Sequence, residues 1–495
     1  MENSNLKEVN YVPTNYEYST TRLKAKNEDK KTDTLFLQFA VITGILLQLE
    51  CSAFWVWIST AMIRMKSNDA NINLLDREIT PMEASLLCGI PLYFSSIVGS
   101  VLSNLADEIG RKNSLHVLGI AMLISSIGLT LSNHIYSIII FYTIIQTISS
   151  GIWGILPVYI TEICEDHNRI KYGCLMSVFT PLGQLYGNVM KLFPSLRTYS
   201  IVLAAPLIPC LVCFFFIPES PVYLLLNKKE EECIIVLKML RSNKTENEIR
   251  QDLNEIGRSL LDTRNNKLTE SIGLVKLLKR REGRIGLILA SLPLYAQYFS
   301  GVFVIMPQLA PTFNKPSSKV SADTMTSIVG IIEVIIFTIT TLIIQKTGRK
   351  PLLMVSSMGA GIMVSIIGVY FYLEDHGYPL TDNFHWLPVI CVVIYRVFYS
   401  FGLGPIPMAT MSELFCPQLR VTALSFISVT IGLLLTIYTT TFSLLIQNIG
   451  IHHSLWIFGF SCFLNTILFA FILPDTKGKS VIEIQEILME YQVRK

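Results

Sequence analysis

The chain has 495 residues, of which 51% are hydrophobic and 16% are charged, and its formal net charge is +3. Soluble proteins usually carry about 25% charged residues, so this composition excludes a large soluble core, and the small net charge gives no reason to expect a nucleic-acid partner. The apolar residues form long runs, and about twenty such residues span a bilayer as a helix. The sequence therefore predicts an all-α membrane protein.

Twelve membrane-spanning segments are predicted from these runs, six in each half of the chain. In chain order they are 35–63, 81–104, 114–132, 136–160, 173–194, 199–217, 285–308, 323–345, 351–372, 387–411, 421–446 and 454–473. The predicted domains are an N-terminal segment (1–34), a six-helix bundle (35–217), a linker (218–284), a second six-helix bundle (285–473) and a tail (474–495).

The distribution of Lys and Arg predicts the orientation. If the N-terminus is cytosolic, the inner segments carry 32 of these residues and the outer loops carry six. Long loops obey the rule weakly, and without the 14 in the linker the inner segments still lead by 18 to six. We therefore predict a multi-pass protein with both termini in the cytosol.

The linker is charged but periodic. Thr245-x-x-Glu248 is a candidate capping box, in which a hydroxyl and a carboxylate bond the first backbone N–H groups of a helix. Four apolar residues then share one helical face: Ile249, Leu253, Ile256 and Leu260. Two or three short amphipathic helices are expected beneath the membrane.

Three charged landmarks occur twice in the same order, displaced by 238, 251 and 256 residues, and this predicts a duplicated six-helix unit. They are Gly110-Arg111-Lys112 with Gly348-Arg349-Lys350, the pair Glu162 and Arg169 with Glu413 and Arg420, and Pro218-Glu219-Ser220 with Pro474-Asp475-Thr476. Each landmark places charge at an inner helix end, where ion pairs between helices hold a gate shut and break when it opens. Simple positive-inside anchoring is the alternative.

These landmarks resemble motifs of the sugar porter family of the major facilitator superfamily, most closely its insect facilitated trehalose transporter-like members, over about residues 35–490. Further motifs carry the resemblance, namely Pro157-Val158-Tyr159-Ile160-Thr161-Glu162, Pro218-Glu219-Ser220-Pro221, Gly404-Pro405-Ile406-Pro407 with Glu413-Leu414-Phe415, and Pro474-Asp475-Thr476-Lys477-Gly478. The resemblance implies twelve helices in two bundles, a central binding site between them, and alternating access by rocking.

The chain departs from the family at the positions that hold sugar. Of the family's Gln-Gln-x-Ser-Gly-x-Asn in span seven, the first residue is kept as Gln297. Other sugar-facing positions carry Ser177, Tyr298, Phe303, Glu333, Met408 and Ile431-Gly432. The resemblance implies an amide at the position of Glu333 and a tryptophan at those of Met408 and Gly432. Two arginines of the family's inner face fall on Tyr142 and Val222, so we expect a weaker cytosolic gate, or one that relies more on the remaining arginines.

Ionisable groups inside a span are costly, which makes Glu50, Glu333 and Arg396 candidates for function. Glu333 could bind hydroxyls or a cationic solute, or carry a proton. The alternative is a structural ion pair with Arg396. Glu50 is a second candidate for proton coupling.

The candidate substrate ligands are Gln297, Tyr298, Ser177, Glu333, Gly404 and Met408. An amide both donates and accepts, which suits a hydroxyl, although Gln297 could instead bond another helix. Pro405 and Pro407 remove backbone donors and predict a helix break that serves as a gate or is a static kink.

The sequence thus predicts facilitated diffusion of a sugar, trehalose or hexose-like, by a monomer in the plasma membrane. A proton symporter using Glu50 or Glu333 and a non-transporting membrane sugar sensor remain alternatives. The ten cysteines and seven histidines form no metal-binding spacing, and no nucleophile–base arrangement or nucleotide-binding loop is visible. No enzyme activity, cofactor or metal is expected, and the partners are the solute and the lipid bilayer.

Overall fold

The computed structural model of the protein describes residues 33–67, 69, 72–75, 77–267, 281–302, 305, 322–378, 384, 386–407, 427, 430–435, 437, 441 and 449–473. Throughout these ranges the regular elements are helices. The predicted features at 408–426 and 474–495, including Met408, Glu413 and Arg420, lie outside them, as does Phe303.

The first half of the chain forms eight α-helices and one short 3-10 helix, which pack around a single hydrophobic core. They are α2 (Leu35–Arg64), α3 (Pro81–Leu102), α4 (Leu105–Ile109), α5 (Arg111–Leu131), α6 (Ile135–Ile163), α7 (Asp166–Val189), η1 (Met190–Leu192), α8 (Leu196–Ala204) and α9 (Leu207–Phe214). The sixth predicted span is divided into α8 and α9 by a turn at Ala205 and Pro206, because proline cannot donate to the helix ladder.

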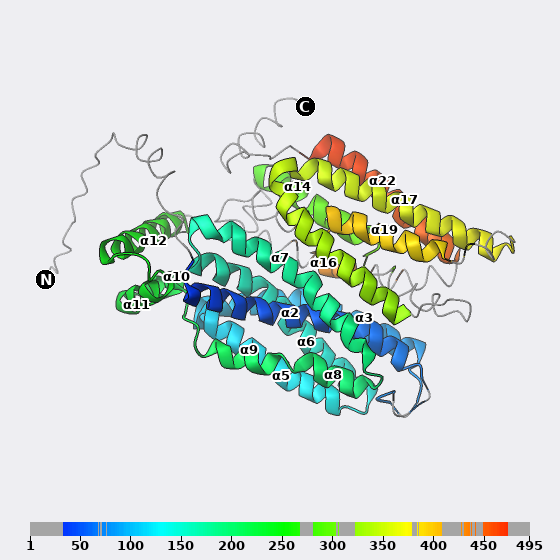
Figure 1. Ribbon diagram of the computed structural model, residues 1–495, viewed down its shortest axis with the longest axis horizontal. Coiled ribbons are helices and arrows are strands. Elements are labelled where there is room, and N and C mark those ends of the chain that lie inside the picture. The colour runs from blue at the N-terminus through cyan, green and yellow to red at the C-terminus, as the bar shows by residue number, and fades with distance from the viewer. Residues whose placement is uncertain are drawn as a thin grey trace.

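The described part of the linker forms three helices, where the periodicity predicted two or three: α10 (Pro221–Leu226), α11 (Glu230–Leu240) and α12 (Glu246–Lys267). Leu224, Cys233, Leu237, Ile249 and Leu253 join in a small core of their own. At the start of α12 the Thr245 backbone N–H donates to the Glu248 carboxylate at 2.7 Å, which is one arm of the predicted capping box. The end of the molecule at which α10, α11 and α12 lie is called the linker face below (Figure 1).

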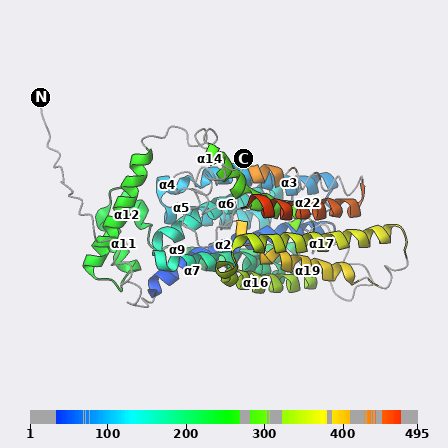
Figure 2. The same cartoon turned by 90° about the horizontal axis from the view of Figure 1, so that it is seen from above.

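The second half contains α14 (Arg281–Phe299), α16 (Ala322–Thr347), α17 (Arg349–Asp375), α19 (Leu387–Phe401) and α22 (Ile451–Ile472), around a second core. Figures 1 and 2 show these helices lying together beside the first half, roughly along the same long axis. Residues 430–435 are also helical, within the predicted eleventh span. The predicted seventh span is interrupted by a turn at Ser300 and Gly301, whose φ is +89°, and Val302 and Ile305 beyond the turn are helical again.

Eight helices of the described residues are long and apolar enough to cross a membrane, and α14 and α19 contribute shorter apolar stretches. Large apolar side chains stay exposed along the outside of these helices, which lipid explains and water does not. On α5 they form a stripe at helical spacing: Val117, Ile120, Ile124, Ile127 and Leu131. The protein is therefore a multi-pass membrane protein, and the total of twelve spans remains a prediction.

The two halves meet through α7 and α16 at the end opposite the linker face (Figure 1). The Ser327 hydroxyl donates to the Asn188 carbonyl at 3.5 Å. A Cβ atom at Gly330 would lie 3.1 Å from the Leu185 side chain, so the helices touch there. From this contact α7 and α16 diverge toward the linker face (Figure 1). The contact therefore joins the halves on the side away from the linker.

Asp33 and Thr34 together tie three elements to one another at the linker face. Burial of this carboxylate opposes its ionisation, but hydrogen bonds from Lys171, Asn168 and Tyr172 and the charge of Lys171 outweigh burial and hold its pKa below the usual 3.8. The next residue, Thr34, caps α2 and donates to the Leu240 carbonyl at the end of α11. The starts of α2 and α7 are thus fixed to the linker helices.

Helices α2 and α7 pack at backbone distance. A Cβ atom at Gly183 would lie 2.3 Å from the Leu49 carbonyl oxygen and 2.8 Å from the Ser52 Cβ. Small residues let membrane helices approach this closely. Gln48 fixes the register, since its amide donates to the Thr180 hydroxyl at 2.9 Å.

We predict that Gly183→Ala destabilises the protein by about 1–3 kcal/mol, the usual cost of overpacking, because a backbone carbonyl cannot move aside as a flexible side chain can. The melting temperature in detergent measures this. Gly173→Ala on the same helix is the control, since a Cβ atom there meets nothing within 4 Å. Equal melting temperatures for the two variants would contradict the predicted close contact.

Candidate functional site

A polar network in the second half joins three helices. Gln297 on α14 donates from Nε2 to the Tyr399 hydroxyl on α19 at 2.8 Å and to the Gly404 carbonyl at 3.4 Å. Arg396 lies one turn before Tyr399, with its guanidinium carbon 5.7 Å from the Tyr399 ring centroid. Arg396 in turn pairs with Glu333 on α16. The structure therefore brings together Gln297, Glu333 and Gly404, three of the predicted substrate ligands.

The predicted helix break follows α19 directly. The helix ends at Phe401, and residues 402–405 form a turn before helical geometry resumes at Ile406 and Pro407. The Leu403 N–H donates to the Ser356 hydroxyl at 2.9 Å instead of to its own helix. A side chain at Gly404 has no room, because its Cβ would lie 2.7 Å from the Phe337 ring. The break leaves the Gly404 carbonyl available to Gln297.

Glu333 and Arg396 form the ion pair that the sequence offered as one alternative. Their closest atoms, Oε2 and Nη2, are 3.4 Å apart, and the side chains are 7% and 15% exposed. Within the described part of the chain, the buried Nε of Arg396 has no hydrogen-bond partner. The pair compensates two charges inside the apolar region, yet it leaves donors on the guanidinium unused.

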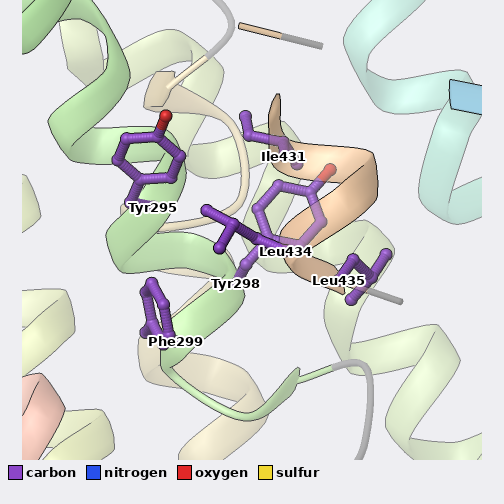
Figure 3. A pocket seen from close by; sticks show the side chains of 6 residues that line it. All are labelled: Tyr295, Tyr298, Phe299, Ile431, Leu434 and Leu435. Carbon is purple, nitrogen blue, oxygen red and sulfur yellow. The ribbon is translucent and has the colours of Figure 1, made fainter. Parts of the chain in front are cut away.

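Tyr298 lines a small apolar pocket. Its other walls are Tyr295 and Phe299 on the same helix and Ile431, Leu434 and Leu435 from the 430–435 segment (Figure 3). The cavity volume is about 10 Å³, which is about the least that holds one water molecule. A sugar does not fit in this pocket in the present conformation.

The remaining sugar-facing positions are spread more widely. Ser177 on α7 donates to the Gly173 carbonyl of its own helix at 3.1 Å, so it is not drawn into the network around Gln297. Gly432, where the resemblance puts a tryptophan, lies directly against α3: a Cβ atom there would be 1.9 Å from the Ser96 Cβ. The loss of that tryptophan lets the second half contact α3.

At the linker face of the first half, Arg111 and Glu162 form an ion pair between α5 and α6; the sequence predicted ion pairs between helices at this face but did not name Arg111 as the partner of Glu162. The Arg111 Nε lies 3.0 Å from the Glu162 Oε2, and its Nη1 donates to the Ala106 carbonyl at 3.0 Å. The Ser220 hydroxyl donates to the same carboxylate. The landmark after span six therefore joins the pair, and three chain segments meet there.

Glu219 accepts hydrogen bonds from the start of α5. Its carboxylate takes the backbone N–H of Lys112 at 2.9 Å and that of Asn113 at 3.4 Å. The first N–H groups of a helix have no partner inside the helix and attract anions. Gly110 makes the approach possible, because its φ of +102° and ψ of +159° are essentially restricted to glycine and its missing side chain leaves room for the carboxylate.

The second half repeats this geometry. Gly348 precedes α17 with φ +89° and ψ +168°, close to the values at Gly110, and Arg349 begins the helix as Arg111 does. The two lysines also correspond: Lys112 donates to the Phe215 carbonyl at 3.4 Å, and Lys350 to the Ala470 carbonyl at 2.8 Å. Sequence reasoning missed this lysine role, although the repeated Gly-Arg-Lys could have suggested it.

The expectation that Tyr142 weakens the cytosolic gate is wrong on geometry. Tyr142 lies near the other end of α6, 20 residues from Glu162, which is about 30 Å along a helix. It packs on Trp57 with ring centroids 4.9 Å apart and accepts a hydrogen bond from Gln146 at 2.7 Å. Val222, in α10, does lie at the linker face.

Glu50 lies midway along α2 and is 1% exposed. Neither of its carboxyl oxygens has a hydrogen-bond partner among the described residues. Such a group is expensive to bury in its charged form. Glu50 is therefore the least compensated acidic side chain that the structure describes.

We predict that Gly110→Ala lowers the melting temperature in detergent. An alanine must leave the glycine-only backbone region, at a cost of about 1–3 kcal/mol, and its Cβ would lie 2.3 Å from the Glu219 Oε2. Gly89→Ala on α3 is the control, since nothing lies within 4 Å of its Cβ. If both variants melt at the temperature of the unmodified protein, the contact of Glu219 with the start of α5 does not require a glycine at position 110.

Comparison with curated proteins identifies insect relatives. The chain is 28% identical over 435 residues to the facilitated trehalose transporter Tret1 of Drosophila pseudoobscura pseudoobscura, covering 88% of this chain and 49% of that protein. It is 27% identical to Tret1 of Culex quinquefasciatus, covering 87% of this chain and 81% of that protein. The chain thus spans about half the length of the Drosophila relatives that it matches.

Solved structures with the same fold include the proton:xylose symporter XylE bound to 6-bromo-6-deoxy-D-glucose, with a TM-score of 0.69 and 21% identity over 92% of this chain and 100% of that one. For the inward open conformation of XylE from E. coli the TM-score is 0.71 and the sequence identity is 21%, over 91% of this chain and 100% of that one. The profile described as "Sugar (and other) transporter" matches residues 23–488. The protein therefore belongs to the sugar (and other) transporter family and has the fold of the major facilitator superfamily.

Proposed function

We propose that the protein carries a sugar, trehalose or a hexose, across the plasma membrane by alternating access and as facilitated diffusion. The observation that carries this proposal is the network of Gln297, Tyr399 and Gly404 beside Glu333. An amide, a phenol, a backbone carbonyl and an ion pair together offer both donors and acceptors, as a polyhydroxyl solute requires. Family membership and the trehalose transporter relatives support the same substrate class.

The proposed orientation places the linker face and both termini in the cytosol, as the distribution of Lys and Arg predicts. With α7 and α16 in contact on the opposite side, the solute path in this conformation leads to the cytosol. The pairs of Arg111 with Glu162 and of Glu219 with the start of α5 would then hold the first half together as it rocks. Arg169, Arg349, Glu413 and Arg420 are proposed to act at the same face.

Within the site, Gln297 and Glu333 would bond the solute, and the turn at 402–405 would let the second half bend. Ser177, Tyr298 and Met408 are proposed to face the path in other conformations. The protein is proposed to act as a monomer, since both halves of the fold lie in one polypeptide.

Counterflow into proteoliposomes tests the function. We expect saturable exchange of labelled trehalose or of a hexose, and none of small cations. Gln297→Ala should lower the exchange at least about tenfold, the effect of losing 1.4 kcal/mol of solute contact. Asn227→Ala removes an exposed amide on the linker and is the control.

Full exchange by the Gln297→Ala variant would mean that the pocket lies elsewhere. Saturable sugar binding without exchange would favour the alternative of a membrane sugar sensor over a carrier. The absence of both binding and exchange for every sugar tested would refute the proposed substrate class.

Proton-coupled sugar transport is the second candidate, and the buried carboxyl of Glu50 favours it. A group that is stable only when protonated in one conformation can release its proton in another. Acid outside should then drive accumulation of the sugar, a protonophore should abolish it, and Glu50→Gln should keep counterflow while losing the response to acid. Uptake that ignores the pH gradient removes this candidate.

A further inference from the structure

Glu333 and Arg396 are the charged pair of the second half, and their setting differs from that of an ordinary buried ion pair. Glu333 takes the position at which the resemblance implies a neutral amide facing the sugar. Arg396 lies on the neighbouring helix, where it meets both Glu333 and the Tyr399 ring. The pair is linked through Tyr399 to Gln297 and the Gly404 carbonyl. It therefore belongs to the proposed solute site and not to a separate helix contact.

The contact between Glu333 and Arg396 does not use all the hydrogen-bond donors and acceptors of the two side chains. A guanidinium has five N–H donors and no acceptor, whereas a carboxylate only accepts. The closest approach, 3.4 Å between the Arg396 Nη2 and the Glu333 Oε2, is long for a charge-assisted hydrogen bond. The buried Arg396 Nε donates to no described residue. Both side chains retain some exposure, so a solute can meet donors on one and acceptors on the other.

We propose that Glu333 and Arg396 form a charge-balanced selectivity element, which admits uncharged sugars and excludes sugars carrying an acidic or a basic group. This inference rests on the proposed sugar transport and adds Arg396 to the site. A neutral polyol can donate a hydroxyl to Glu333 and accept from Arg396 without separating the pair. A sugar acid meets the Glu333 charge, and an amino sugar meets that of Arg396.

The physical basis is the cost of an uncompensated charge in a largely dry site. Placing two like charges side by side in such surroundings costs several kcal/mol. Separating a buried ion pair is also costly, because each residue of the pair then becomes an uncompensated buried charge. Either charge alone would instead attract the opposite kind of solute. The intact pair therefore excludes both kinds of charged sugar. Glu333 alone would favour a cationic sugar, and Arg396 alone would favour an anionic one.

Two single variants and one double variant test this in counterflow with three probes: the best neutral sugar, glucuronate, and glucosamine at pH 6. Glu333→Gln leaves Arg396 unbalanced and should raise glucuronate exchange relative to the neutral sugar at least about tenfold. Arg396→Gln leaves Glu333 unbalanced and should do the same for glucosamine. The double variant Glu333→Gln with Arg396→Gln contains neither charge, so its discrimination against both charged sugars should fall below that of the unmodified protein.

Size-exclusion profiles report whether each variant folds. If a single variant does not fold, the double variant provides the test, because it buries no lone charge. Unchanged exclusion of glucuronate and glucosamine in the folded variants overturns the proposal and leaves the pair as helix packing. An unmodified protein that exchanges a neutral sugar but also both charged ones overturns it equally. A protein that exchanges no sugar at all overturns the proposed function as well, which separates the two failures.

Discussion

A polar group in the apolar region of a membrane protein must find its partner inside the protein, because lipid supplies none. This constraint explains where the polar side chains of the chain gather. Glu219 meets the unpaired N–H groups at the start of α5, and Gln297 meets the Gly404 carbonyl that the end of α19 leaves free. The irregular backbone and the functional side chains occupy the same places, since each satisfies the other.

The duplicated unit shows how backbone geometry constrains sequence more tightly than side-chain contacts do. Gly110 and Gly348 have nearly the same φ and ψ, and each is followed by an arginine and a lysine. Each lysine donates to a carbonyl at the end of a later helix of its own half, Lys112 to that of Phe215 just after α9 and Lys350 to that of Ala470 near the end of α22. A glycine-only conformation allows the chain to turn sharply from one helix into the next, and the cations that follow it bind the neighbouring helix ends.

Most of the helices could be predicted from sequence because runs of apolar residues are long and unambiguous, as in α2, α16 and α17. Helix ends were less predictable: α7 begins seven residues before its apolar run, because Asp166 to Tyr172 are polar yet helical. Of the site, Gln297, Glu333 and Gly404 were predicted and do lie together. The partner of Glu333 was predicted as one alternative, but Tyr399 was not, since a tyrosine in an apolar run carries no signal until its neighbours are known.

The residues that hold the helices together and those of the proposed solute site therefore have different binding partners. The residues around Glu162 contact other residues of this chain, so their identities follow from the protein's own geometry. The residues around Gln297 are proposed to match a solute as well, and there the chain departs from the residues that the resemblance implies. A carboxylate introduced at position 333 alone would place a lone charge in the membrane region, and Arg396 on α19 removes that cost. The altered pocket thus remains compatible with an uncharged solute, because the charge of Glu333 is balanced within the protein before any solute binds.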